Sequence, residues 1–157
     1  MRLIVVVLLA GLLTGAGAAP SHADFAAGLE AYDAGDFETA AAEWRPLAEA
    51  GSAEAQVALA DLYHNGLGVP ADTAAAARWY RRAAEKGDAV AQLNLGDLYS
   101  RGRGVARDLA EAYAWLTLAA AQGRAWAERR RHDILPLLSE AEHAKAEALI
   151  AERRQGE

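Results

Sequence analysis

One 36-residue stretch of this sequence occurs twice in succession. Residues 53–88 (AEAQVALADLYHNGLGVPADTAAAARWYRRAAEKGD) align without a gap with residues 89–124 (AVAQLNLGDLYSRGRGVARDLAEAYAWLTLAAAQGR), and 17 of the 36 positions are identical. Tandem units of this length are typical of solenoids, in which each unit buries its apolar face only by stacking on its neighbours. This repeat constrains the fold more than any other feature of the chain.

Each unit is predicted to be a pair of helices joined by a glycine-rich turn. Apolar residues from Ala55 to Tyr63 recur with helical spacing, and Gly66 and Gly68 follow them. Glycine readily takes the positive φ with which a helix commonly ends. Asp72 comes next and is suited to cap the second helix, which carries its own apolar stripe. The glycine-rich segment between the two helices is therefore interpreted as the joint of a structural repeat and not as a phosphate-binding loop.

The period extends in weaker form on both sides of the two copies. The predicted helical repeat domain covers 24–157, with a hairpin at 25–51, repeats at 53–88 and 89–124, and a partial repeat with a capping helix at 125–154. Pro136 is expected to end the helix of 125–135. Ser139 and Glu142 have capping-box spacing before the last helix, as Asp108 and Glu111 have before an earlier one.

Residues 1–23 have the composition of a secretory signal peptide. Arg2 precedes the apolar run of 3–13, and small residues lead to Ser21-His22-Ala23, a plausible cleavage site. The alternative is an uncleaved anchor, but the run is shorter than the roughly 20 residues that span a membrane. We therefore expect an exported protein that meets the membrane only through this peptide before cleavage. The periplasm is favoured, and secretion stays open.

Composition excludes several classes of function. The chain has no cysteine, so disulfides, thiol catalysis, cysteine metal sites and a lipoprotein anchor are excluded. The net charge is −6, which together with export argues against nucleic acid as a partner. Residues 78–132 differ from the rest, with eleven basic and six acidic side chains. This segment could attract an anionic partner.

The repeat resembles a known family. A unit reading A-x-A-Q-x-x-L-x-D-L-Y-x-x-G-x-G-V-x-x-D, followed by A-x-x-W and A-A-x-x-G, looks like the Sel-one-like (Sel1-like) repeat, a relative of the tetratricopeptide repeat. The resemblance implies an all-α fold, a right-handed α-solenoid of antiparallel helical hairpins, here about three hairpins plus a C-terminal capping helix. It also implies a concave groove lined by the first helix of each unit. Family members in the bacterial envelope are mostly adaptors and regulators that bind proteins.

The sequence offers no constellation for catalysis. No serine lies in a nucleophile motif. Asp61 and His64 could offer two metal ligands on one helix face, but Ser100 stands at the position of His64 in the other copy and no third ligand is evident. A branch of the family associated with penicillin binding carries a disulfide in each repeat, and this chain cannot. We therefore expect no enzyme activity, no metal and no cofactor.

The family geometry implies which residues face the groove. Carried onto this sequence, the expected partner-binding residues are Leu29, Tyr32, Glu54, Val57, Asp61, His64, Asn65, Val90, Leu93, Asp97, Ser100 and Arg101. Asp61 and Asp97 lie 36 apart and would form an acidic ladder, which suits a peptide or helix that carries lysine or arginine. The alternative is that both carboxylates are structural and bond to a neighbouring helix.

Trp126 and Arg129 form a second set of candidate contacts at the end of the groove. Trp79 and Trp115 occupy equivalent repeat positions and are expected in the core, whereas Trp126 breaks the pattern. Residues 129–131 are three arginines, interpreted chiefly as a solvated face and alternatively as a contact for an anion or a protein.

The favoured function is an exported adaptor or regulator that binds a segment of a protein partner. Binding of an envelope polymer and, less favoured, an enzyme acting on cell-wall material or β-lactams remain alternatives. Association with a second copy also stays open.

Overall fold

The computed structural model describes residues 22–155, and this part of the chain contains helices and no strand. The predicted signal peptide falls almost entirely outside the described residues and stays a prediction. The elements are α1 (His22–Asp33), α2 (Phe37–Glu49), α3 (Ala53–Asn65), α4 (Thr73–Ala84), α5 (Ala89–Arg101), α6 (Leu109–Ala121), α7 (Ala125–Ile134), the 3-10 helix η1 (Leu135–Leu137) and α8 (Glu140–Gln155).

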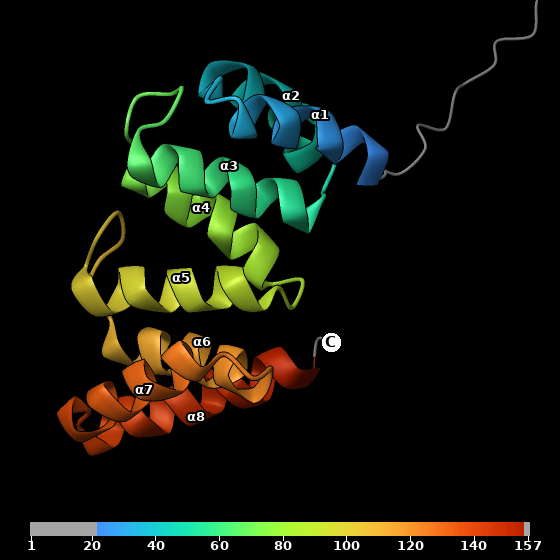
Figure 1. The fold of residues 1–157 in the computed structure, drawn as a ribbon. Coiled ribbons are helices and arrows are strands. Elements are labelled where there is room, and N and C mark those ends of the chain that lie inside the picture. Colours follow the sequence, from blue (N-terminus) through green and yellow to red (C-terminus); the bar gives the residue numbers. More distant parts are fainter. Residues whose placement is uncertain (1–21, 156–157) are drawn as a thin grey trace, which may run out of the picture.

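The helices form consecutive antiparallel hairpins that stack along one direction (Figure 1). Helices α1 and α2, α3 and α4, and α5 and α6 pair within hairpins, while α2 packs on α3 and α4 on α5. Helix α8 returns to pack on α6, so it covers the end of the stack. The prediction of a helical solenoid closed by a terminal helix is confirmed. None of the described helices is long and apolar enough to cross a membrane.

Side chains cap the starts of most helices, including the predicted caps at Asp72 and Asp108. Helices α2 to α6 each begin after an aspartate or serine whose side chain accepts a hydrogen bond from a first-turn N–H. Ser139 and Glu142 form a reciprocal capping box, with the Ser139 N–H donating to Glu142 at 2.9 Å and the Glu142 N–H to Ser139 at 3.3 Å.

The second predicted capping box is only half formed. Asp108 accepts hydrogen bonds from the first turn of α6, but its own N–H donates to the Tyr99 carbonyl at 3.1 Å. Glu111 instead pairs with Arg153 of α8 at 2.7 Å. The prediction of a reciprocal box at Asp108 is therefore wrong, because the Asp108 N–H is bonded to the preceding helix and the Glu111 carboxylate to α8.

The two glycines of each joint have different roles. Gly66 and Gly102 end α3 and α5 in the left-handed conformation, at φ of 67° and 65°. Gly68 and Gly104 also have positive φ, and they lie directly against the backbone where the preceding second helix begins. A Cβ on Gly104 would overlap the Thr73 carbonyl of α4. The joint of each unit thus touches the unit before it.

Repeated positions make repeated contacts between hairpins. Gln56 and Gln92 are buried, and each donates to the carbonyl eight residues earlier, that of Ala48 at 2.9 Å and that of Ala84 at 3.3 Å. Hydrogen bonds that recur in the same register join Arg45 to Tyr63 and Arg81 to Tyr99, and Lys86 to Gly51 and Gln122 to Gly87. The sequence period therefore fixes how successive hairpins stack.

The two equivalent tryptophans differ in burial. Trp115 is buried as predicted, with the Arg153 guanidinium stacked 3.8 Å from its ring centroid. Trp79 is only half-buried, and the Arg82 guanidinium lies 4.8 Å from its ring centroid. The core prediction is thus correct for Trp115 and only partly correct for Trp79.

Candidate interaction surface

A hollow of about 140 Å³ opens between α3, α4 and α5. It is lined by Asp61, His64, Tyr80, Asn94, Asp97 and Leu98. Three of these residues, Asp61, His64 and Asp97, belong to the predicted groove. We call the side of the solenoid formed by α3 and α5 around this hollow the first-helix face.

Asp61 is held by the second helix of its own hairpin. The Tyr80 hydroxyl donates a short hydrogen bond to the Asp61 carboxylate. Burial raises the pKa of Asp61, although the Tyr80 hydrogen bond and the nearby His64 act in the opposite direction. The same burial and the Asp61 charge raise the pKa of Tyr80, so Tyr80 stays a donor at neutral pH.

His64 lies beside this pair and is half-buried. Its Nδ1 atom is buried and has no hydrogen-bond partner within residues 22–155. A buried polar atom without a partner costs free energy.

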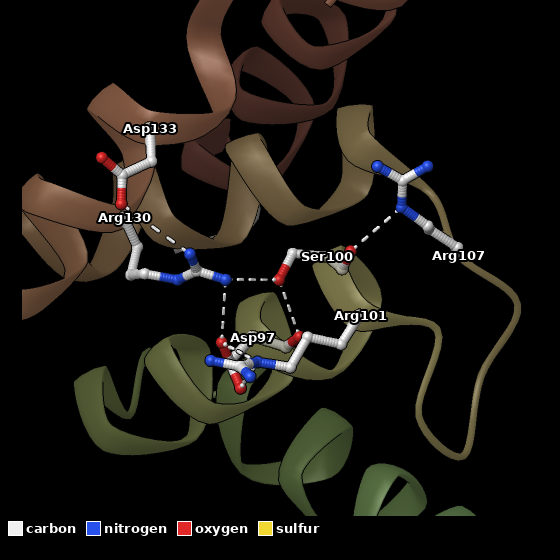
Figure 2. Close-up of polar contacts among 6 residues, drawn as sticks. All are labelled: Asp97, Ser100, Arg101, Arg107, Arg130 and Asp133. Carbon is white, nitrogen blue, oxygen red and sulfur yellow. Dashed lines mark hydrogen bonds and ion pairs between the residues drawn. The ribbon is translucent and has the colours of Figure 1, made fainter. Parts of the chain in front are cut away.

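Asp97 is held by the next hairpin (Figure 2). The Arg101 Nε lies 2.8 Å from one Asp97 oxygen, and an Arg130 η-nitrogen from α7 lies 3.2 Å from the other. The same Arg130 nitrogen donates to the Ser100 hydroxyl at 3.1 Å. The Asp97 side chain is only 21% exposed. This cluster ties α5 to α7.

The acidic ladder therefore consists of carboxylates that already have partners. An incoming lysine or arginine would compete with Tyr80 for Asp61 and with two guanidinium groups for Asp97. These contacts agree with the alternative interpretation, in which both carboxylates are structural and bond to neighbouring helices. The prediction of a basic partner segment remains untested.

The other predicted groove residues differ in exposure. Val57, Val90 and Leu93 are half-buried, and Val57 and Leu93 pack against the core. Glu54 and Asn65 are exposed, and the Asn65 amide donates to the Asp61 carbonyl at 2.8 Å.

Two predicted groove residues lie away from the hollow, on the terminal helix α1. Leu29 is 45% exposed and Tyr32 is 38% exposed. Tyr32 contacts the rings of Phe37 and Trp44, with centroids 5.1 and 5.8 Å away. The hollow therefore brings together only part of the predicted set.

The arginine run of α7 is only partly a solvated face. Arg130 reaches back to α5, and Arg131 pairs with Glu128 at 2.6 Å while lying 5.9 Å from the centroid of the Tyr113 ring. Only Arg129 of the three is exposed. The interpretation as a solvated face is therefore wrong for Arg130 and Arg131, whose guanidinium groups contact other side chains, and it holds for Arg129.

Trp126, the other candidate at this end, is 38% exposed. The Arg130 guanidinium lies 5.6 Å from the centroid of its ring. Trp126 thus lies at the surface next to the Asp97 cluster, where it could take part in a contact with a partner.

Two residues of this region were missed by sequence reasoning. Tyr80 belongs to the apolar stripe that the sequence indicates for the second helix of the unit, yet its hydroxyl bonds Asp61. Arg107 was not considered, although its Nε donates to the Ser100 carbonyl at 3.1 Å. Arg107 could have been found as a difference between the two copies of the repeat, since Ala71 stands at the equivalent position in the first copy.

A larger hollow of about 380 Å³ lies on the other side, between α4, α6 and α8. Its wall includes Trp115 and Arg153, which together with Glu111 hold the capping helix in place. No three histidine, aspartate or glutamate side chains of residues 22–155 are arranged to hold a metal ion.

Comparison with known proteins identifies the repeat. The family model of the Sel1 repeat matches residues 53–88 and 89–123. No curated protein matches the chain.

Solved structures show the same fold. One is a protective antigen present in uropathogenic Escherichia coli strains, displaying an SLR fold. It is 29% identical to this chain with a TM-score of 0.80, and the match covers 85% of this chain and 30% of that one. Another is a Sel1 repeat protein from Oxalobacter formigenes, 36% identical with a TM-score of 0.63, over 68% of this chain and 43% of that one.

The chain thus matches less than half the length of either structure. The repeat sequence, the stacked hairpins and these neighbours agree with one another. The chain contains two Sel1 repeats, at residues 53–88 and 89–123, within a helical solenoid of the fold seen in these neighbours.

Proposed function

We propose that the chain is an exported protein–protein interaction module, an adaptor or regulator that holds a segment of a partner protein on the first-helix face. Sel1 repeats typically serve as protein-binding scaffolds, which supports the class of function. The observation that carries the proposed site is the hollow between α3, α4 and α5, which is lined by the predicted groove residues Asp61, His64 and Asp97.

The two copies of the repeat support this location. Within the first helices, most identical positions are buried, among them Ala55, Leu59 and Leu62. The positions that differ are 54, 57, 58, 60, 64 and 65, and all of them except 60 reach the surface. The fold therefore leaves the first-helix face free to carry different side chains in each copy, as a surface that recognises a particular partner requires.

Export remains part of the proposal and has its own test. The full-length chain would be expressed in a bacterial host, and the mass of the product recovered from the periplasm would be measured. Loss of residues 1–23 would support export through a cleaved signal peptide. An uncleaved product that stays in the cytoplasm would contradict it.

The binding site is tested by capture from an envelope extract. The protein is compared with a Val57→Lys/Leu93→Lys variant, whose lysines extend from half-buried positions of the first-helix face. The matched control is Ala42→Lys/Ala121→Lys, which adds the same charge at exposed positions of α2 and α6. Circular dichroism verifies that the variants are equally helical.

We expect a protein that the parent and the control retain and the Val57/Leu93 variant loses. Equal retention by all three would place the site elsewhere. Capture of polysaccharide or cell-wall material alone would overturn the adaptor proposal in favour of polymer binding.

A further inference from the structure

The joint of the second repeat carries arginines that the first joint does without. Arg101, Arg103 and Arg107 occupy the positions of Asn65, Leu67 and Ala71 in the first copy. Both joints have the same helix-ending glycines, with φ within a few degrees of one another. The first joint shows that this conformation needs no arginine, so the fold does not account for the three basic side chains.

Arg101 and Arg107 are both anchored through Nε. The Arg101 Nε bonds Asp97 at 2.8 Å, and the Arg107 Nε donates to the Ser100 carbonyl at 3.1 Å. Figure 2 shows the Arg107 guanidinium bonded to Ser100 and the Arg101 guanidinium against Asp97. The η-nitrogens of these two residues make no hydrogen bond or ion pair within residues 22–155. The outer ends of both guanidinium groups are therefore available to a ligand, and Arg101 is 49% exposed.

The acidic side chains around Arg101 and Arg107 do not pair with the η-nitrogens of these two arginines. Asp97 is shared between Arg101 and Arg130. Asp133 is 67% exposed and lies 3.7 Å from Arg130. Glu142 of α8 has its pKa lowered mainly by Ser139, with a smaller contribution from Arg107. Asp97 and Glu142 have other partners, and the free hydrogen-bonding capacity of Arg101 and Arg107 themselves consists of donors.

We propose that Arg101 and Arg107 bind carboxylates of an acidic segment of the protein partner, one that carries at least two Asp or Glu side chains. A guanidinium group whose η-nitrogens are free matches the geometry of a carboxylate. The net charge of −6 opposes a long polyanion such as nucleic acid but adds little penalty for a short acidic segment. This proposal rests on the proposed function and gives its partner a chemical character opposite to the one expected from Asp61 and Asp97.

The probe is a short fluorescein-labelled peptide with two Glu-Glu pairs separated by glycine, and its twin carries glutamine in place of each glutamate. Binding is measured by fluorescence anisotropy at low and moderate ionic strength, with the protein expressed from the full-length chain. A single-stranded oligodeoxynucleotide of similar net charge is the third probe.

The test variant restores the residues of the first joint, as Arg101→Asn/Arg107→Ala. The first copy folds with these residues, so the variant is expected to fold. Arg107→Ala alone leaves the Asp97 pairs intact and serves as a second variant. The matched control is Arg78→Asn/Arg154→Ala, which removes the same charge from exposed positions on α4 and α8.

The glutamate peptide should bind the parent at least about 10-fold more tightly than its glutamine twin, as charge-assisted hydrogen bonds require. The Arg101/Arg107 variant should bind it about 5- to 30-fold more weakly, and the control within about 2-fold of the parent. Equal binding by the Arg101/Arg107 variant and the control would overturn the proposal. Tighter binding of the oligonucleotide, with the same loss in the variant, would also overturn it and mark a phosphate site.

The capture experiment separates this inference from the proposed function. An envelope protein that the Val57/Leu93 variant loses and the Arg101/Arg107 variant keeps would leave the adaptor proposal intact and refute the acidic partner. A protein that both variants lose would support both proposals.

Discussion

Replacement of Gly104 by alanine should destabilise the solenoid more than the same replacement at Gly123, which also has a positive φ. Gly104 has a φ of +69°, where an L-residue is disfavoured by roughly 1–2 kcal/mol. Alanine also restricts the unfolded chain, which returns about 0.4–1 kcal/mol. The backbone conformation alone therefore accounts for a loss of about 1 kcal/mol.

Steric overlap adds a second and larger contribution. A Cβ at residue 104 would overlap the Thr73 carbonyl and lie 2.8 Å from the Ala74 nitrogen. Both are backbone atoms at the start of α4 and cannot rotate aside, so the joint must move away from the preceding hairpin. Such overpacking typically costs about 1–3 kcal/mol. The total expected loss for Gly104→Ala is about 2–4 kcal/mol.

Gly123→Ala is the matched control. Gly123 has a φ of +82°, and no heavy atom lies within 4 Å of a Cβ built there. We expect a loss of only about 1 kcal/mol, from the backbone term alone. Urea denaturation followed by far-UV circular dichroism gives both free energies of unfolding. Equal losses in the two variants would refute the idea that the joint holds neighbouring hairpins together by close backbone contact.

Two further predictions concern pH. Tyr80→Phe removes the hydrogen bond that opposes the rise in the Asp61 pKa. Because a carboxyl pKa that is raised in the folded state destabilises the fold above that pKa, the free energy of unfolding should fall by about 1–2 kcal/mol at pH 7. This loss should shrink below about pH 4, where Asp61 is protonated in both the folded and the unfolded state. An identical loss in urea denaturation at both pH values would contradict this. Burial raises the pKa of Asp108, but Lys145 and the first-turn N–H groups of α6 together lower it below its usual value. Lys145→Ala removes one of these contributions, so the loss should be about 0.2–1 kcal/mol at neutral pH and decrease with added salt. This loss should disappear as pH falls through the lowered pKa of Asp108. A loss that persists in acid would show that Lys145 acts through packing.

The parts of the fold that repeat could be predicted from the sequence. Glycines and capping residues act within a few residues of their own position, so Gly66, Asp72 and the box of Ser139 and Glu142 were identified before any contact was known. The 36-residue period then indicated the stacking, because equivalent residues such as Gln56 and Gln92 make equivalent contacts.

The partners of the two aspartates could not be predicted in the same way. Asp61 is bonded by Tyr80 within its own hairpin, but Leu116 replaces that tyrosine in the next copy. Asp97 finds Arg130, which lies 33 residues further along the chain. These contacts depend on the rotation of one hairpin against the next, which no local pattern encodes.

Arg101 and Arg107 are found by looking for differences between the two copies of the repeat, and not for identities. Identity between copies marks what the fold needs, and it drew attention to Asp61 and Asp97. Arg107 is visible only as a departure from Ala71. Where two repeats share one backbone conformation, the residues that differ are the better guide to a partner.

Hydrogen–deuterium exchange on the captured complex tests the central claim most directly. The amides of the protein are compared with and without the protein partner, so that the binding face is located without any substitution. The account predicts that added protection is concentrated in α3, α5 and the joint of 102–108, and exceeds that in α2, α4 and α6. Protection confined to the second helices, or none in α3 and α5, would contradict binding on the first-helix face.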